Sequence, residues 1–166
     1  AQVEQALKFS GGTEAAGARS QPVARRGARP ALSGAVLVVD DETTVGEFMR
    51  ELLETWGLEA TSVASGQAAL DLVTAAPERF DAVITDQSMP RMTGLQLAKA
   101  MHALRPGLPV ILYTGYAEGI ARSELEAAGI RKVLAKPVDP GALEAALVGV
   151  LPVANRGDRG RAQDPA

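Results

Sequence analysis

The stretch VITDQSMPRMTG, residues Val83–Gly94, places a single acid, Asp86, at the end of an apolar run. A short run of β-branched residues is typical of a strand that is buried on both faces, as strands of parallel sheets are. The polar residues, the proline and the glycine that follow indicate a loop that leads into a helix. We therefore expect Asp86 where a buried strand ends, in a position that is rigid, partly desolvated and still reachable from solvent.

Around this stretch, short apolar runs alternate with segments of helical periodicity. Strands are predicted at 35–39, 58–64, 81–86, 109–114 and 132–136, and helices at 43–56, 65–76, 94–104, 118–128 and 139–150. Strands that alternate with helices require crossover connections and a parallel sheet covered on both faces. The sequence therefore predicts an α/β fold, a flavodoxin-like, doubly wound five-stranded parallel sheet of order 2-1-3-4-5 with five helices.

Residues with short polar side chains mark the predicted helix starts. Thr43 or Thr44 is the predicted cap of the first helix, Ser65 opens the second, and Asp139 caps the last. Gly129 is expected to end the fourth helix, because glycine adopts the backbone conformation that follows a helix at little cost.

The periodic region covers residues 34–151, which we expect to form one domain. Residues 1–33 are rich in Gly, Ala, Arg, Ser and Pro and are predicted to be a flexible linker or tail. Residues 152–166 are predicted to be a disordered tail. The chain has no cysteine, so disulfide bonds and thiolate chemistry are excluded.

Charge is distributed unevenly along the 166 residues, whose net charge is −3. Residues 1–31 hold five basic and two acidic side chains, whereas residues 32–151 hold nine basic and sixteen acidic ones. An acidic domain argues against nucleic-acid binding, and the arginines of residues 25–29 are interpreted as part of a solvated linker. No apolar run approaches the ~20 residues of a membrane span, so we expect a cytoplasmic chain without membrane contact.

Polar residues follow four of the predicted strands: Asp40 and Asp41 the first, Asp86 the third, Thr114 the fourth and Lys136 the fifth. In doubly wound sheets, ligands bind beyond the carboxyl ends of the strands. Packed carboxylates repel one another unless they share a proton or bind a cation, and an all-oxygen site open to solvent suits Mg²⁺. An aspartate beside such an ion can attack a phosphoryl group in line, while a lysine and a hydroxyl neutralise the transferring oxygens.

Four motifs, VLVVDDE, VITDQSMPRMTG, ILYTGY and LAKP, resemble those of the receiver domains of bacterial response regulators. The resemblance covers about Ala35–Val150. It implies that Asp86 accepts a phosphoryl group from a phosphohistidine on a histidine kinase or a histidine phosphotransfer protein, and that a downstream protein target senses the change. It further implies that the domain catalyses only its own phosphorylation and dephosphorylation, and is not otherwise an enzyme.

The resemblance also assigns roles within the site. It implies Mg²⁺ held by the side chains of Asp41 and Asp86 and by the carbonyl of Ser88, with Asp40 contributing through water. Thr114 would hydrogen-bond the phosphoryl group and Lys136 would form an ion pair with it. The family usually has a cis peptide before the proline at position 137.

The sequence departs from the family at one position. Receivers commonly carry an aromatic switch residue three positions before the lysine, where this chain has Val133. A β-branched side chain is nearly locked in a strand and offers no ring to swing. Tyr116 is the candidate substitute for the aromatic switch, and the alternative is that Tyr116 is an ordinary surface residue. In the family, the positions of Ser88 and Tyr116 tune the lifetime of the aspartyl phosphate.

Several interpretations stay open. The chain is either a stand-alone receiver or a piece of a hybrid sensor histidine kinase, where it could serve as a phosphate sink or scaffold. The hybrid context is favoured by the Gly/Arg-rich linker, the TGYAEG segment and the missing initial methionine. A homodimer is also left open.

Two other classes of protein are disfavoured. A haloacid-dehalogenase-type phosphatase needs a second acid at Ser88, and a nucleotide-binding module needs glycines in the acidic turn that follows the first strand. A zinc or histidine-based site is disfavoured because the only histidine, His102, falls within a predicted helix.

Overall fold

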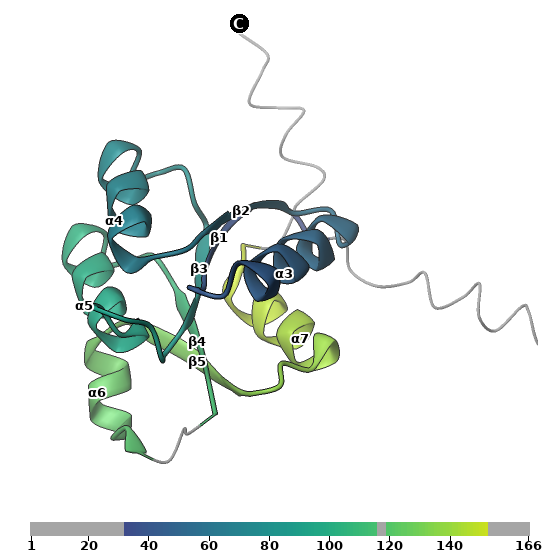
Figure 1. The fold of residues 1–166 in the computed structure, drawn as a ribbon. Helices are drawn as coiled ribbons and strands as arrows, with labels where there is room; N and C mark the ends of the chain where they lie inside the picture. The colour runs from purple at the N-terminus through teal and green to yellow at the C-terminus, as the bar shows by residue number, and fades with distance from the viewer. Residues whose placement is uncertain (1–31, 116–118, 153–166) are drawn as a thin grey trace, which may run out of the picture. The chain divides into compact units, whose positions relative to one another are not determined.

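A computed structural model describes residues 32–115 and 119–152 of the chain (Figure 1). The strands of this part are β1 (Ala35–Val39), β2 (Glu59–Val63), β3 (Ala82–Asp86), β4 (Val110–Thr114) and β5 (Ile130–Ala135). The helices are α3 (Thr43–Thr55), α4 (Gly66–Ala75), α5 (Gly94–Leu104), α6 (Arg122–Ala127) and α7 (Pro140–Val150). Strands and helices alternate, as the periodicity predicted.

All neighbouring strands pair in parallel, in the order β2-β1-β3-β4-β5. This confirms the predicted flavodoxin-like topology. The order reverses at β1, because the chain moves outward to β2 and then returns to place β3 on the other side. The carboxyl ends of β1 and β3 therefore lie side by side at the switch point, with the end of β4 next to β3.

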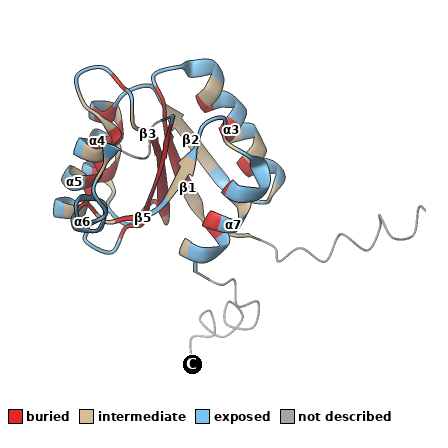
Figure 2. Cartoon of the chain, turned by 90° about the horizontal axis from the view of Figure 1, so that it is seen from below, coloured by how far each residue is buried: buried red, intermediate tan, exposed pale blue. Residues whose placement is uncertain are grey.

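Side chains of the sheet alternate between two apolar layers. In β1, Leu37 and Val39 pack with residues of α4 and α5 on one face, while Val36 and Val38 pack with α3 and α7 on the other. Figure 2 shows the buried sheet between these two groups of helices, whose outer faces are exposed. Because both faces are covered, the central strands are mostly apolar and carry their polar groups toward their carboxyl ends.

Two of the predicted helix caps are confirmed and one is wrong. The side chain of Ser65 accepts a hydrogen bond from the backbone N–H of Ala68 at 3.1 Å, and Asp139 Oδ2 accepts one from Ala142 at 2.9 Å. The cap of α3 is Glu42, without a side-chain cap bond, rather than either threonine. Thr43 is already helical, because the chain turns into the helix immediately after the acids that follow β1.

A capping box at α5 was not predicted. Thr93 accepts a hydrogen bond from the backbone of Gln96, and the Gln96 side chain accepts one from the backbone of Thr93. The spacing of threonine and glutamine is the known sequence signal for this motif. The box fixes the first turn of the helix that follows Asp86.

Two further boundaries differ from the prediction. The helix α6 covers Arg122–Ala127 instead of 118–128, and β5 begins at Ile130 rather than 132. Gly129, with φ of +76°, turns the chain so that Ile130 pairs at once with Val110 of the neighbouring strand. The predicted tails lie almost entirely outside the described residues, so the division into a domain and two tails remains a prediction.

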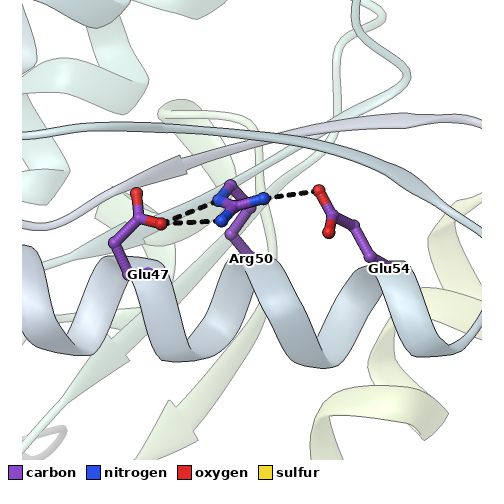
Figure 3. Close-up of polar contacts among 3 residues, drawn as sticks. All are labelled: Glu47, Arg50 and Glu54. Atoms are coloured by element: carbon purple, nitrogen blue, oxygen red, sulfur yellow. Dashed lines mark hydrogen bonds and ion pairs between the residues drawn. The ribbon is translucent and has the colours of Figure 1, made fainter.

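The outer face of α3 carries a charged group that takes no part in the core. Figure 3 shows Arg50 between Glu47 and Glu54, with its guanidinium within 2.8 Å of one carboxylate and 2.6 Å of the other. Such exposed pairs three or four residues apart support a helix modestly. We assign this group to helix stability.

Gly94 gives the first test of the fold. A Cβ atom at this position would lie 2.3 Å from the carbonyl oxygen of Asp86 and 2.6 Å from Leu112 Cδ1. The backbone oxygen cannot move without shifting the end of β3. We expect Gly94→Ala to lower the free energy of unfolding in urea by about 1–3 kcal/mol.

The matched control is Gly107→Ala, because an added Cβ there meets nothing within 4 Å. This control should leave the free energy of unfolding within about 0.5 kcal/mol of the wild type. Equal stability of the two variants would show that the close approach at Gly94 does not constrain the fold.

Candidate functional site

The polar residues predicted from the strand ends gather at one edge of the sheet. Asp86 is the last residue of β3 and Thr114 the last of β4, while Asp40 and Lys136 directly follow β1 and β5. Asp40, Asp86 and Thr114 are almost fully buried, with 1%, 2% and 3% exposed, respectively. Because the strands are parallel, their carboxyl ends bring these residues together from four separate segments of the chain.

Three carboxylates form the centre of the site. One oxygen from each of Asp40, Asp41 and Asp86 lies within 4.8 Å of the other two. Asp41 is exposed, so the cluster is open to solvent on its side. Hard oxygen ligands that combine buried and exposed carboxylates fit Mg²⁺, which keeps several of its waters when it binds to proteins. The donor set therefore fits the predicted metal.

Lys136 supplies the positive charge. Its Nζ lies 2.9 Å from Asp86 Oδ1, and the backbone N–H of Ser88 donates to the same oxygen at 3.2 Å. Partial burial lowers the pKa of Lys136, but the hydrogen bond and charge of Asp86 outweigh this effect and raise the pKa overall. Lys136 therefore remains charged, and both donors hold one oxygen of Asp86.

Asp40 is held by two donors, one on each oxygen. The backbone N–H of Glu42 donates to Oδ1 at 2.9 Å, and the hydroxyl of Tyr113 donates to Oδ2. Burial raises the pKa of the Asp40 carboxyl, and the charge of Asp86 raises it further, while the two hydrogen bonds lower it in part. Asp40 is thus a fixed carboxylate behind the exposed Asp41.

Gln87 anchors the loop that follows Asp86. Its backbone N–H donates to the carbonyl of Tyr113 at 3.1 Å, and its own carbonyl accepts from Gly94 at 3.1 Å. Its side-chain oxygen accepts from the backbone of Leu95 at 2.9 Å. One residue therefore ties the end of β3 to β4 and to the first turn of α5, which holds both sides of the loop.

The segment after β5 is tied to Thr114. The backbone N–H of Lys136 donates to the carbonyl of Thr114 at 3.0 Å. The Lys136–Pro137 peptide is cis, which confirms the expectation from the family resemblance. The hydrogen bond from the Lys136 backbone to Thr114, at the end of β4, places Lys136 beside the acidic cluster.

Other residues singled out in the sequence lie elsewhere. Val133 is half-buried in β5 against the layer of α4 and α5. His102 lies in the last turn of α5, at the opposite end of that helix from Asp86, and its buried Nδ1 has no hydrogen-bond partner among the described residues. Tyr116 lies outside the described residues.

Sequence reasoning missed two residues of the site, Gln87 and Tyr113. The only signal for Tyr113 is a hydroxyl at the end of the otherwise apolar VILY run, one residue before Thr114. Burial raises the pKa of this phenol, and the hydrogen bond to Asp40 raises it further, so the group keeps its proton and acts as a donor.

Comparison with known proteins decides the family. A model of the response regulator receiver domain matches residues 36–148 of the chain. The chain belongs to the response regulator receiver domain family. The described fold and the acidic cluster are those expected for a receiver, a phosphoacceptor domain of two-component signalling.

Relatives of different lengths share this receiver. The chain is 31% identical to sporulation initiation phosphotransferase F of Bacillus subtilis over 118 residues. The aligned residues make up 71% of this chain and 94% of that protein. The chain is 34% identical over 112 residues to the transcriptional regulatory protein ZraR of Escherichia coli, covering 68% of this chain. The match spans only 25% of the length of ZraR.

Solved receiver structures have the same fold. The chemotaxis protein CheY4 of Vibrio cholerae aligns with a TM-score of 0.66 and 31% identity, over 72% of this chain and all of that one. A response regulator receiver domain from Clostridium thermocellum aligns with a TM-score of 0.66 and 29% identity, over 70% of this chain and 92% of that one. In the described part of this receiver, no helix has the length and apolar character to cross a membrane.

The charge crowding in the cluster yields a second prediction. Two like charges about 5 Å apart repel by about 1 kcal/mol even in water. Asp41→Asn removes one of them while keeping the shape of the exposed side chain. We expect this variant to raise the free energy of unfolding by about 1 kcal/mol in EDTA, and to lose most of the added stability that Mg²⁺ gives the wild type.

Urea unfolding with and without MgCl₂ measures both effects. Glu51→Gln, an exposed acid of α3 outside the cluster, is the control and should change neither quantity. A loss of stability in EDTA on removing the Asp41 charge would mean that the acids do not repel one another as the geometry indicates.

Proposed function

We propose that Asp86 is the phosphoacceptor of this receiver and takes its phosphoryl group from a phosphohistidine on a histidine kinase or a histidine phosphotransfer protein. The observation that carries the proposal is the contact of a buried aspartate with Lys136 in the acidic cluster. Lys136 and the Ser88 amide both donate to Oδ1 of Asp86, so the carboxylate is held in place beside a positive charge.

In the proposed transfer, a carboxylate oxygen of Asp86 forms a bond to phosphorus as the bond between phosphorus and the histidine nitrogen breaks. The electron pair of the broken bond stays on the imidazole, and the product is an aspartyl phosphate. Lys136 and the hydroxyl of Thr114 neutralise charge on the transferring oxygens. Thr114 ends β4, the strand next to β3, and Lys136 already contacts Asp86, so both groups lie at the edge of the sheet where the transfer would occur.

We assign the Mg²⁺ site to the side chains of Asp41 and Asp86 and the carbonyl of Ser88, with Asp40 acting through a bound water. The ion would supply positive charge beside the phosphoryl oxygens. The two oxygens of Asp40 each already accept a hydrogen bond, which favours an indirect role for this residue. The exposed Asp41, in contrast, offers its carboxylate to solvent and to the ion.

A groove beside the site supports docking of a histidine-bearing partner. Apolar side chains of α3 line it together with the segment after β5, and Lys136 and Tyr113 form part of its wall. Phe48 of α3 is 60% exposed there. An apolar surface next to a buried phosphoacceptor suits a partner that must bring its phosphohistidine close to Asp86.

The biological context belongs to the same proposal. We place the receiver in the cytoplasm, either alone or within a hybrid sensor histidine kinase, with phosphorylation altering its contacts with a downstream protein. A role as phosphate sink or scaffold is the alternative output. Val133 favours an output that does not depend on an aromatic side chain at that position.

The test of the phosphoacceptor uses acetyl phosphate as donor and intact-mass spectrometry as readout. We expect a phosphoryl adduct on the wild type that requires Mg²⁺ and is absent from Asp86→Asn, because an amide oxygen is a poor nucleophile. Asp71→Asn changes an exposed acid on α4 outside the cluster and should be phosphorylated normally. A full adduct on Asp86→Asn would move the phosphoacceptor to another residue.

Lys136 gives a test of the transfer step itself. We expect Lys136→Ala to slow phosphorylation by on the order of 100-fold, the usual effect of removing one group that stabilises developing charge. Mg²⁺ binding should be retained, because the carboxylates remain and one positive charge has gone. Initial rates of adduct formation at saturating Mg²⁺ measure this effect, and a rate equal to that of the wild type would remove Lys136 from the mechanism.

A further inference from the structure

Tyr113 contacts more residues of the site than a side chain that only fills the core would need to. It is the penultimate residue of β4 and is fully buried among residues of the layer formed with α3 and α7. Its backbone pairs with Asp86 in the sheet register, and its carbonyl accepts the N–H of Gln87. Its hydroxyl donates to Asp40, and the centre of its ring lies 5.3 Å from Lys136 Nζ.

A plain packing role does not explain the hydroxyl. A buried phenol costs free energy unless its O–H finds a partner, so an apolar site is better filled by phenylalanine or leucine. Here the partner is a carboxylate that follows a different strand, 73 residues away in the chain. The ring itself faces the ammonium of Lys136 at a distance that is typical of cation–π contacts.

We propose that Tyr113 is a positioning residue of the metal and phosphoryl site, which orients Asp40 through its hydroxyl and Lys136 through its ring. The inference rests on the proposed function and adds to it a residue that touches neither the ion nor the phosphoryl group. With the N–H of Glu42 on Oδ1 and Tyr113 on Oδ2, Asp40 cannot rotate without breaking a hydrogen bond.

A hydrogen bond to Asp40 can also act against metal binding, so the experiment must measure whether its removal weakens or strengthens that binding. A donor on Asp40 withdraws charge from that carboxylate, which by itself would weaken its attraction for a cation. The geometry favours positioning, because both oxygens of a nearly buried group are held in place before any ion arrives. Removal of such outer partners typically weakens metal binding by 10–100-fold.

The decisive variant is Tyr113→Phe, which removes the hydroxyl and keeps the ring over Lys136. Isothermal titration with MgCl₂ should show a Kd about 10-fold higher than that of the wild type. In adduct formation from acetyl phosphate, the half-saturating Mg²⁺ concentration should rise by a similar factor. The maximal rate at saturating Mg²⁺ should stay within about 2-fold of the wild type, because the groups around Asp86 are kept.

Ile111→Val is the matched control for core packing. Ile111 lies on the same strand and in the same buried layer as Tyr113, two residues away. This variant loses one buried methylene and should cost about 0.5–1.5 kcal/mol of stability, as measured in urea. Its Kd for Mg²⁺ should match that of the wild type, which separates general loosening of the core from loss of the hydroxyl.

The outcomes are distinct for the two proposals. A Tyr113→Phe variant that binds Mg²⁺ as tightly as the wild type, or more tightly, overturns the positioning role. So does a weaker Kd that Ile111→Val reproduces. If the wild type binds Mg²⁺ but forms no adduct with acetyl phosphate, the phosphoacceptor proposal fails, while the titration still decides the role of Tyr113.

Discussion

The ion pair between Lys136 and Asp86 is the interaction on which the site depends. Asp86 belongs to a buried strand and is 2% exposed, so its charge needs a partner that water cannot supply. Lys136 follows β5, 50 residues after Asp86 in the chain, and its Nζ lies 2.9 Å from Asp86 Oδ1. The pairing of β5 with β4, and of β4 with β3, brings Lys136 to the same edge of the sheet as Asp86.

The same edge of the sheet collects more negative than positive charge. Asp40, Asp41 and Asp86 come within 4.8 Å of one another, and Lys136 is in contact with only one of them. The apolar clusters on the two faces of the sheet hold these strand ends in place, since every strand that leads into a site residue is packed on both faces. The crowded acids form a cluster that could hold a cation, and without one their mutual repulsion lowers the stability of the fold.

Hydrogen bonds and close packing with β4 and α5 hold the loop after Asp86 in place. Gln87 ties the end of β3 to β4 and α5, and Gly94 allows the helix to start directly against the carbonyl of Asp86. On the other side, Tyr113 of β4 brings an aromatic ring to the site, whereas β5 carries Val133. The ring over Lys136 therefore comes from the neighbouring strand and is locked in the core, which differs from a side chain that swings at the surface.

Local patterns in the sequence determined most of this receiver. Apolar runs and helical periodicity are local properties, and parallel crossovers leave few ways to connect them, so the strand order and the edge that carries Asp40, Asp86, Thr114 and Lys136 could be predicted. Only the tertiary structure decided the cap at Glu42, the early start of β5 and the hydrogen bond from Tyr113 to Asp40. The last two features arise from contacts between segments far apart in the chain, 73 residues in the case of the hydrogen bond, which no local pattern encodes.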